Sequence, residues 1–326
     1  MGSRLHYRWL LNSSYTLSAS QMFETIMNIP AEVIELVRHI FRQANIAATK
    51  MISESPNVWE ETLDMALITQ LNYYDKPIQA THECLLKLET HFLGGRKIFH
   101  NWEIADIGII VLFRIRGKLV RTKLVMLQSK RLYPNEISEP KELEQYHYLA
   151  GFSRLYRENE DYAADINPRV YTWSWNSKYR AIKSQDDQEN AIRDYEQQTR
   201  IPVYYLLYNP YKMAWKMSVP TYKPLGSGNI SLGVRVLPSS DIRAACAGLS
   251  KDAAPSAERI SAVRMGISRG YNRLGKRFED FIADRILGCH EGYITQDPED
   301  RGLARVFFRR NAPISAAIAI TIDVDK

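Results

Sequence analysis

Three polar residues inside apolar stretches are the residues of this chain best suited to chemistry. Asp106 stands near the start of a run rich in Ile, Val, Leu and Phe, and Gln128 and Lys130 stand near the end of a second such run. Carboxylate and amide oxygens are ligands that a hard cation such as Mg²⁺ accepts, and a lysine can stabilise charge on a phosphate. Together these residue types indicate metal-dependent hydrolysis of a phosphodiester.

The two apolar runs predict a β-hairpin that would bring the three residues together. Gly117 lies between the runs and has the backbone freedom that a tight turn requires. If the two neighbours of Gly117 pair with each other, Asp106 lies opposite Gln128, and Lys130 shares their face because side chains alternate along a strand. A shift of one residue would separate them unless a bulge restored the register. The structural alternative is a strand that ends at Asp106, with Gln128 and Lys130 on a solvated edge.

A predicted helix before the hairpin provides a fourth candidate. The stretch 57–71 has leucines at helical spacing, and its first residue, Asn57, is a suitable N-cap. Glu60 extends the leucine stripe toward the N-terminus, whereas Glu61 is about 100° further round the helix. A carboxylate at the edge of a buried face calls for an ion partner or a metal, so we prefer Glu60 over Glu61 and Asp64. Acidic residues also favour the first turn through the helix dipole, which leaves the choice between the two glutamates open.

In order and spacing these residues resemble the core of the restriction-endonuclease-like PD-(D/E)xK nucleases. More narrowly, they are similar to the Mrr-like branch, in which Gln replaces the second acidic residue of the motif. The resemblance covers about residues 57–150 and rests on a short motif. It implies that Asp106, Gln128 and Glu60 bind Mg²⁺ or Mn²⁺ and that Lys130 is the catalytic lysine. Gln128 is neutral, and a neutral ligand binds a cation more weakly than a carboxylate does.

The resemblance also implies a function. It predicts a metal-dependent endonuclease that acts on double-stranded DNA, with a role in prokaryotic restriction or antiviral defence by analogy. The alternative is a catalytically inactive nuclease-fold subunit that binds nucleic acid or assembles a defence complex, because the neutral Gln128 is compatible with a degenerate site. Helical segments at both ends of the chain favour a homo-oligomer or a subunit of a larger complex.

The composition excludes several other classes of protein. The 326 residues are 45% hydrophobic and 25% charged, as in an ordinary globular protein with a real core. No apolar run reaches the length of about 18 residues that a membrane helix needs, and the N-terminus lacks a signal-peptide layout, so we expect a cytoplasmic protein without membrane contact. The three cysteines lie far apart without zinc spacing, which predicts free thiols. P-loop and dinucleotide-binding motifs do not occur.

Basic and aromatic residues permit nucleic-acid binding without requiring it. The net charge is +6, and basic residues gather in 118–131, in 264–277 and at Arg309 and Arg310. A solvated surface is the commoner explanation for such groups. Clusters of Tyr and Trp could stack on bases, although packing in the core is their commoner use.

Alternating helical and extended patterns predict an α/β fold with a mixed central sheet flanked by helices, as in restriction-endonuclease-like proteins. We divide the chain into an N-terminal helical segment (1–55), a nuclease-like core (56–247) and a C-terminal helix with strands (258–326) that packs on the core or on a partner. The stretch 248–257 is the candidate linker, and 212–233 is predicted to be a loop-rich excursion or lid. The other predicted elements are helices at 31–41, 140–158, 186–200 and 273–287 and strands at 169–175, 201–210, 232–238, 303–309 and 314–324.

Overall fold

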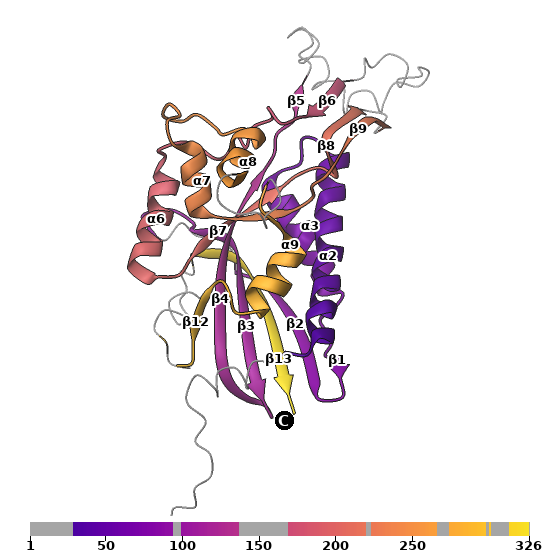
Figure 1. Ribbon diagram of the computed structural model, residues 1–326, viewed down its shortest axis with the longest axis vertical. Helices are drawn as coiled ribbons and strands as arrows, with labels where there is room; N and C mark the ends of the chain where they lie inside the picture. The colour runs from indigo at the N-terminus through magenta and orange to yellow at the C-terminus, as the bar shows by residue number, and fades with distance from the viewer. Residues whose placement is uncertain are drawn as a thin grey trace, which may run out of the picture.

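A large mixed β-sheet forms the centre of the protein, and helices cover both of its faces (Figure 1). The computed structural model describes the residues 29–93, 99–136, 169–219, 223–265, 274–297, 300 and 313–325. Within them the sheet has nine strands, which are in spatial order β1 (Ile78–Thr81), β2 (Cys84–Phe92), β13 (Ile314–Val324), β3 (Ala105–Ile115), β4 (Lys118–Arg131), β7 (Val203–Tyr208), β10 (Arg235–Pro238) and β11 (Lys276–Arg277), with β12 (Tyr293–Thr295) paired to β4. This is the α/β class with a mixed central sheet that the alternating patterns predicted.

The central sheet joins segments that are far apart in the sequence. β13, near the C-terminus, runs parallel to β3 and antiparallel to β2, so the predicted strand 314–324 lies in the same sheet as the predicted hairpin. β4 forms that hairpin with β3 and runs parallel to β7 on its other side. The ends of β4 and β7 therefore lie side by side, and the polar residues of interest gather there.

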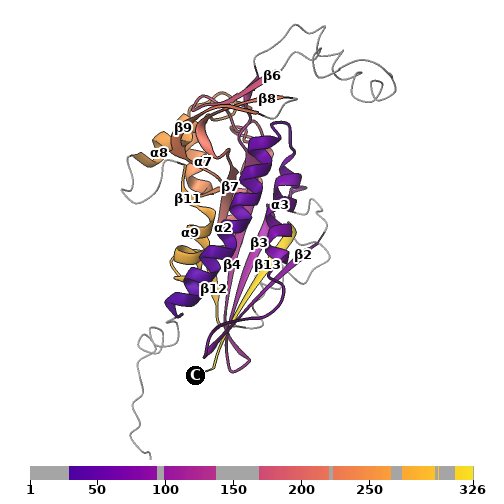
Figure 2. The same cartoon turned by 90° about the vertical axis from the view of Figure 1, so that its right-hand side faces the viewer.

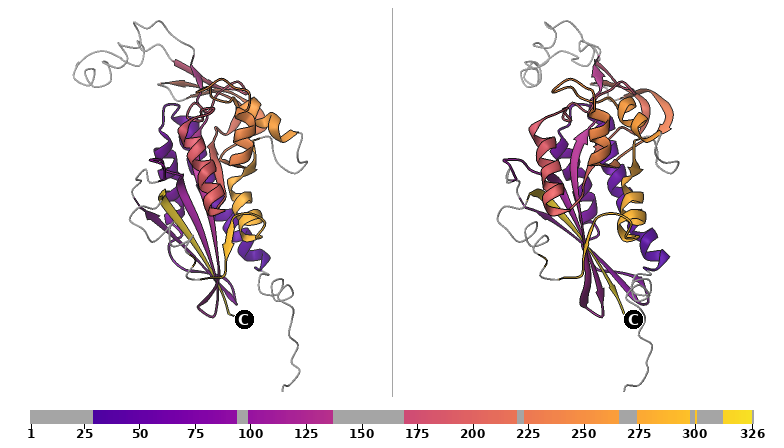
Figure 3. Two further views of the ribbon diagram at one scale, coloured as in Figure 1. Left: turned by 90° about the vertical axis from the view of Figure 1, so that its left-hand side faces the viewer. Right: turned by 60° about the vertical axis from the view of Figure 1, so that its left-hand side comes forward.

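Two layers of helices enclose the sheet. α2 (Ala31–Glu54) and α3 (Glu60–Asn72) lie over one face (Figure 2), and α6 (Asp187–Thr199) lies over the other (Figure 3). On the side of α6, α7 (Ser239–Cys246) packs on β7 and β10, and α8 (Ala257–Met265) packs on α7. The short α9 (Phe278–Asp280) continues as a π-helical segment, η2 (Phe281–Leu287), and both pack on α2.

Apolar periodicity explains which faces these elements bury. In α2, Val37, Ile40 and Phe41 are fully buried, at the three- and four-residue spacing of one helix face. The leucine stripe of α3 is buried in the same way. All six residues of β7 are buried, as a strand covered on both faces requires. The helix predicted at 31–41, which extends further than expected, and the strand predicted at 201–210 are confirmed.

A second sheet lies at one end of the molecule, at the top of Figure 1. Its strands in the described residues are β5 (Asn135–Glu136), β6 (Arg169–Trp173), β8 (Lys212–Val219) and β9 (Lys223–Ser231). The prediction that 212–233 is a loop-rich excursion or lid is therefore wrong. Met213 and Met217 are buried at the alternating positions of a strand. Pro224 is tolerated because β9 is an edge strand, where a missing N–H can face solvent.

The turn of the β3–β4 hairpin differs from the predicted turn by one residue. Ile115 pairs with Lys118, so Arg116 and Gly117 form a two-residue turn, with φ angles of 49° and 75°. Positive φ at both positions is the geometry of the turns that fit the twist of a hairpin. A register shift next to Phe113 then places one extra residue in β4, which is a bulge.

The bulge restores the register that was predicted for the functional residues. Beyond it, Ile107 pairs with Leu127, so Asp106 lies opposite Gln128. The turn lies one residue from its predicted position, and the pairing of Asp106 with Gln128 is nevertheless the predicted one, because the shift at the turn and the bulge cancel each other. Without the bulge, the side chains of β4 would be displaced by one position and would face the other side of the sheet.

Among the remaining predicted elements, the helix 186–200 and the strands 169–175 and 232–238 are confirmed as α6, β6 and β10. The predicted helix 273–287 is helical only from Phe278 onward, because Lys276 and Arg277 form β11. The predicted helix 140–158, the strand 303–309, most of the basic stretch 264–277 and the arginines at 309 and 310 lie outside the described residues.

The predicted N-cap of α3 and the predicted linker differ from what the structure shows. α3 begins at Glu60 with Trp59 as its N-cap, so the prediction of Asn57 as N-cap is wrong; the Asn57 amide instead donates a hydrogen bond to the Tyr171 hydroxyl. The candidate linker 248–257 makes backbone hydrogen bonds with the segment 177–184.

All three cysteines are free thiols, as expected. In the described part of the chain no helix combines the length and the apolar composition needed to cross a bilayer.

Candidate functional site

The end of the hairpin holds Asp106 and Gln128 in direct contact. The Gln128 amide nitrogen donates a hydrogen bond of 2.5 Å to Asp106 Oδ2, and the backbone N–H of Ser129 donates to the same oxygen at 2.6 Å. Asp106 is half-buried and Gln128 is buried. The predicted cross-strand pairing thus brings both predicted residues together.

Glu60 and Lys130 meet beside this pair, because α3 packs on β4. Glu60 Oε1 accepts a hydrogen bond of 2.9 Å from the backbone N–H of Arg131, and its Oε2 lies 3.9 Å from Lys130 Nζ. The Lys130 side chain is only 7% exposed. Glu61, in contrast, is exposed on the outer side of α3. The structure therefore places Glu60, and not Glu61, against the hairpin.

Asp64 belongs to the same group, although Glu60 was the predicted carboxylate of this helix. Its Oδ1 accepts hydrogen bonds of 2.5 Å from the Ser129 hydroxyl and of 2.5 Å from the Tyr208 hydroxyl at the end of β7. Asp64 follows Glu60 by four residues, and such residues share one face of a helix. That spacing was the signal that could have identified it. We call Glu60, Asp64, Asp106, Gln128 and Lys130 the β4 cluster.

Burial and mutual repulsion dominate the electrostatics of the β4 cluster. Burial raises the pKa of Asp106 to about 7, although the charge of Lys130 and the Ser129 N–H lower it. Burial likewise raises the pKa of Asp64 well above its usual range, and the charge of Asp106 raises it further. The pKa of Glu60 is raised by burial and lowered by Lys130. Crowded carboxylates share protons at neutral pH unless a cation compensates their charge.

The donor groups of the β4 cluster fit a hard divalent cation. Gln128 Oε1 is buried and has no hydrogen-bond partner among the described residues. If the Gln128 amide were flipped, Oε1 would face the Asp106 carboxylate and be repelled by it. The orientation with the amide nitrogen toward Asp106 is therefore the favourable one. The described residues contain no group of three or more His, Cys, Asp or Glu side chains arranged to hold a metal. Mg²⁺ needs fewer than three such side chains, because it retains several water ligands and accepts one or two carboxylates together with neutral oxygens. Asp106, Asp64 and Gln128 supply that set.

Glu60, which was predicted to be a metal ligand, lies against Lys130 and the end of β4. Its Oε1 accepts the hydrogen bond from the Arg131 N–H, and its Oε2 lies 3.9 Å from the ammonium of Lys130. This position suits orientation of Lys130 as well as a share in holding a cation. Asp64 is a second helix acid suited to share a cation, because its carboxylate accepts hydrogen bonds from Ser129 and Tyr208 and the charge of Asp106 raises its pKa.

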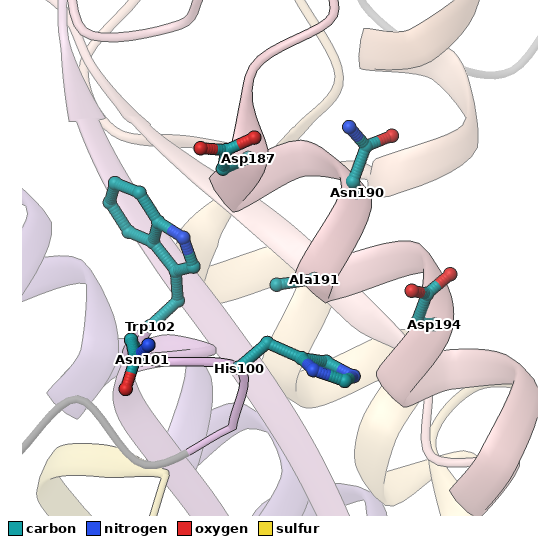
Figure 4. Close-up of a pocket in the computed structure, with 7 residues that line it drawn as sticks. All are labelled: His100, Asn101, Trp102, Asp187, Asn190, Ala191 and Asp194. Carbon is teal, nitrogen blue, oxygen red and sulfur yellow. The ribbon is translucent and has the colours of Figure 1, made fainter.

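A separate cavity of about 500 Å³ lies between the start of β3 and α6 (Figure 4). In Figure 4 the rings of Trp102 and His100 face the helix that carries Asp187, Asn190 and Asp194. Its lining in the described residues is His100, Asn101, Trp102, Asp187, Asn190, Ala191 and Asp194. None of these belongs to the β4 cluster, and two carboxylates without a lysine or arginine are poorly suited to a phosphate. We therefore place the candidate chemistry in the β4 cluster.

Cation binding by the β4 cluster should be measurable without any catalysis. Mg²⁺ at ten times its dissociation constant is expected to raise the free energy of unfolding by about 1.4 kcal/mol. Replacement Asp64→Asn is expected to weaken Mg²⁺ binding about tenfold or more, because it removes a charge from the donor set. Calorimetric titration and urea unfolding with and without Mg²⁺ provide the measurement. Glu61→Gln, one turn earlier and exposed, is the control and should bind Mg²⁺ like the wild type. Equal Mg²⁺ affinity in Asp64→Asn and the wild type would contradict the assignment.

Comparison with known proteins does not add a relative. No model of a protein family matches the chain, and neither the curated proteins nor the solved structures contain a match.

Proposed function

We propose that the protein is a metal-dependent nuclease that hydrolyses phosphodiester bonds of DNA at the β4 cluster. The observation that carries the proposal is the hydrogen-bonded pair of Asp106 and Gln128, with a buried lysine two residues further along β4. These are the residue types and the spacing for which the resemblance to Mrr-like nucleases implies catalysis. By the same resemblance we infer double-stranded DNA as the general substrate and restriction or antiviral defence as the role.

Each residue of the β4 cluster has a part in this proposal. A divalent cation held by Asp106, Asp64 and Gln128 would neutralise phosphate oxygens and lower the pKa of an attacking water. Lys130 has three ammonium donors, and its contact with Glu60 at 3.9 Å is too long for a hydrogen bond. The ammonium therefore remains able to donate to a phosphate oxygen on which charge develops. Glu60, fixed by the Arg131 N–H, keeps that ammonium beside the carboxylates.

A second candidate is a catalytically inactive nuclease-fold subunit that binds nucleic acid or assembles a defence complex. The observation in its favour is the neutral Gln128, whose amide nitrogen already donates to Asp106. A hydrogen bond from an amide to a carboxylate partly compensates the negative charge that a bound cation would otherwise compensate. The two candidates differ in one measurable property, which is turnover.

The test is cleavage of supercoiled plasmid by the purified full-length chain with Mg²⁺, Mn²⁺, Ca²⁺ or EDTA. The proposal predicts nicking or linearisation with Mg²⁺ or Mn²⁺ and none with EDTA. Single-stranded DNA and RNA of the same sequence are assayed in parallel. Cleavage that persists in EDTA would contradict the metal-dependent mechanism. Absence of cleavage of all three substrates, together with DNA binding, would favour the inactive subunit.

A further inference from the structure

A solvent-exposed tryptophan stands directly beside the β4 cluster. Trp59 is the N-cap residue of α3 and immediately precedes Glu60. Its side chain is 77% exposed, and tryptophan is among the residues that are mostly buried in folded proteins. In the described part of the chain, no hydrogen bond or ring contact involves its indole. Packing in the core therefore does not explain this residue.

The residues on both sides of Trp59 are held at the end of β4, Val58 by its backbone and Glu60 by its side chain. The Arg131 guanidinium donates hydrogen bonds to the carbonyl oxygens of Pro56, at 3.0 Å, and of Val58. The backbone N–H of the same arginine donates to Glu60 at 2.9 Å. Arg131, which follows Lys130 in the chain, thus holds the backbone at Pro56 and Val58 and the side-chain carboxylate of Glu60. An exposed ring on a backbone held in this way is pre-organised relative to the cluster, which reduces the entropy that binding would cost.

The surroundings of Trp59 indicate what would cover it. Charges of both signs lie near Trp59: Glu60 and Glu61 follow it in the chain, and the buried Lys130 and Arg131 lie beneath the N-terminus of α3. A second aromatic–cation group continues from the same strand end: the guanidinium of Arg131 lies 4.0 Å from the centre of the Tyr133 ring, and that of Arg180 lies 5.4 Å from it. An exposed aromatic ring close to basic groups is a feature by which proteins bind the bases and phosphates of unpaired nucleic-acid strands.

We propose that Trp59 is a stacking platform for an unpaired nucleobase beside the phosphate that the β4 cluster attacks. This inference rests on the proposed function and narrows its substrate. A base that stacks on Trp59 has left its own stack, which costs a few kcal/mol in an intact duplex and less at a mismatch, a nick or a single strand. The preferred substrate is therefore DNA with unpaired nucleotides at the site of cleavage, such as a single strand or a distorted duplex.

The experiment measures binding in EDTA, so that it does not depend on cleavage. Fluorescence anisotropy follows a labelled single-stranded oligonucleotide and its fully paired duplex with the full-length wild type, Trp59→Ala, Trp59→Phe and Tyr73→Ala. Stacking of one base contributes about 1–3 kcal/mol, so Trp59→Ala is expected to weaken single-strand binding about 5- to 150-fold. Trp59→Phe should retain most of the affinity, and binding to the duplex should change less. Tyr73, at the other end of α3 and 76% exposed, is the matched control and should have no effect.

Several outcomes would overturn this inference. They are an unchanged affinity for the single strand in Trp59→Ala, an equal loss in Tyr73→Ala, and no single-strand binding by the wild type. A dimer in the wild type that Trp59→Ala dissociates would also overturn it, because a second copy would then cover the ring. Failure of the proposed function would give a different result. If the wild type never cleaves DNA and Trp59→Ala binds the single strand more weakly than the wild type, the binding surface is supported and only the nuclease activity is refuted.

Discussion

Replacement of Asp106 by asparagine is expected to abolish cleavage and, at pH 8, to make the protein more stable. Asparagine keeps the shape of the side chain and an oxygen that can accept the hydrogen bond from the Ser129 N–H. It removes the charge that would hold a cation, so cleavage should fall at least about 100-fold. It also removes a carboxylate whose ionised form is disfavoured in the folded protein. Loss of activity together with gain of stability is typical of a group retained for function.

The pH dependence of this stability change follows from the pKa of Asp106. Burial raises that pKa from 3.8 to about 7, so between these values the folded protein binds more protons than the unfolded chain. The free energy of unfolding that Asp106 contributes is therefore lost as the pH rises from about 4 to about 7, and it stays lost above 7. After allowance for solvent screening, we expect Asp106→Asn to gain about 1–2 kcal/mol at pH 8 and much less at pH 4.5.

Urea unfolding of the wild type and Asp106→Asn at pH 4.5 and pH 8, without divalent cations, measures this effect. Mg²⁺ should stabilise the wild type and not the variant, because it replaces the proton that the carboxylate would otherwise take up. Glu61→Gln is again the control, since an exposed glutamate should change neither stability nor its pH dependence. An Asp106→Asn protein that is less stable than the wild type at pH 8, or that cleaves at the wild-type rate, would refute the assignment.

Replacement of Lys130 by methionine is expected to reduce the single-turnover rate about 100- to 1,000-fold while cation binding persists. Methionine preserves most of the buried volume of the 7%-exposed side chain and removes the ammonium. The charge of Lys130 lowers the pKa of both Asp106 and Glu60, so its loss should raise these pKa values further. Mg²⁺ binding should therefore require a higher pH in Lys130→Met than in the wild type.

Two measurements separate catalysis by Lys130 from a general effect on folding. The first is the single-turnover rate at saturating Mg²⁺, and the second is the pH at which Mg²⁺ binding is half-maximal. In Lys130→Arg the pH of half-maximal Mg²⁺ binding should return to the wild-type value, because the positive charge is restored. The single-turnover rate should stay below that of the wild type, since a planar guanidinium does not fit in the place of an ammonium. Lys87→Met, on an exposed part of β2, is the control and should leave both quantities unchanged. Cleavage at the wild-type rate by Lys130→Met would show that the lysine is structural.

Local sequence patterns were sufficient to predict the elements that carry the β4 cluster. The apolar runs on either side of Gly117 determine the hairpin, and alternation along β4 determines that Gln128 and Lys130 share one face. The leucine stripe of α3 determines that Glu60 turns inward while Glu61 stays exposed. These features depend on residues that are close in the sequence, where the period of the side chains is enough to assign a face.

Long-range packing decided the rest. The placement of β13 between β2 and β3 joins residues more than 200 positions apart, and the hydrogen bond from Tyr208 to Asp64 depends on the parallel pairing of β4 with β7. The bulge near Phe113 corrects a turn that a local pattern places one residue off. The sequence by itself determined which residues could do chemistry and on which faces of their own elements they lie. Only the tertiary structure decided that Asp64 joins them and that Trp59 stays uncovered, because burial and charge at a site depend on elements that no local pattern specifies.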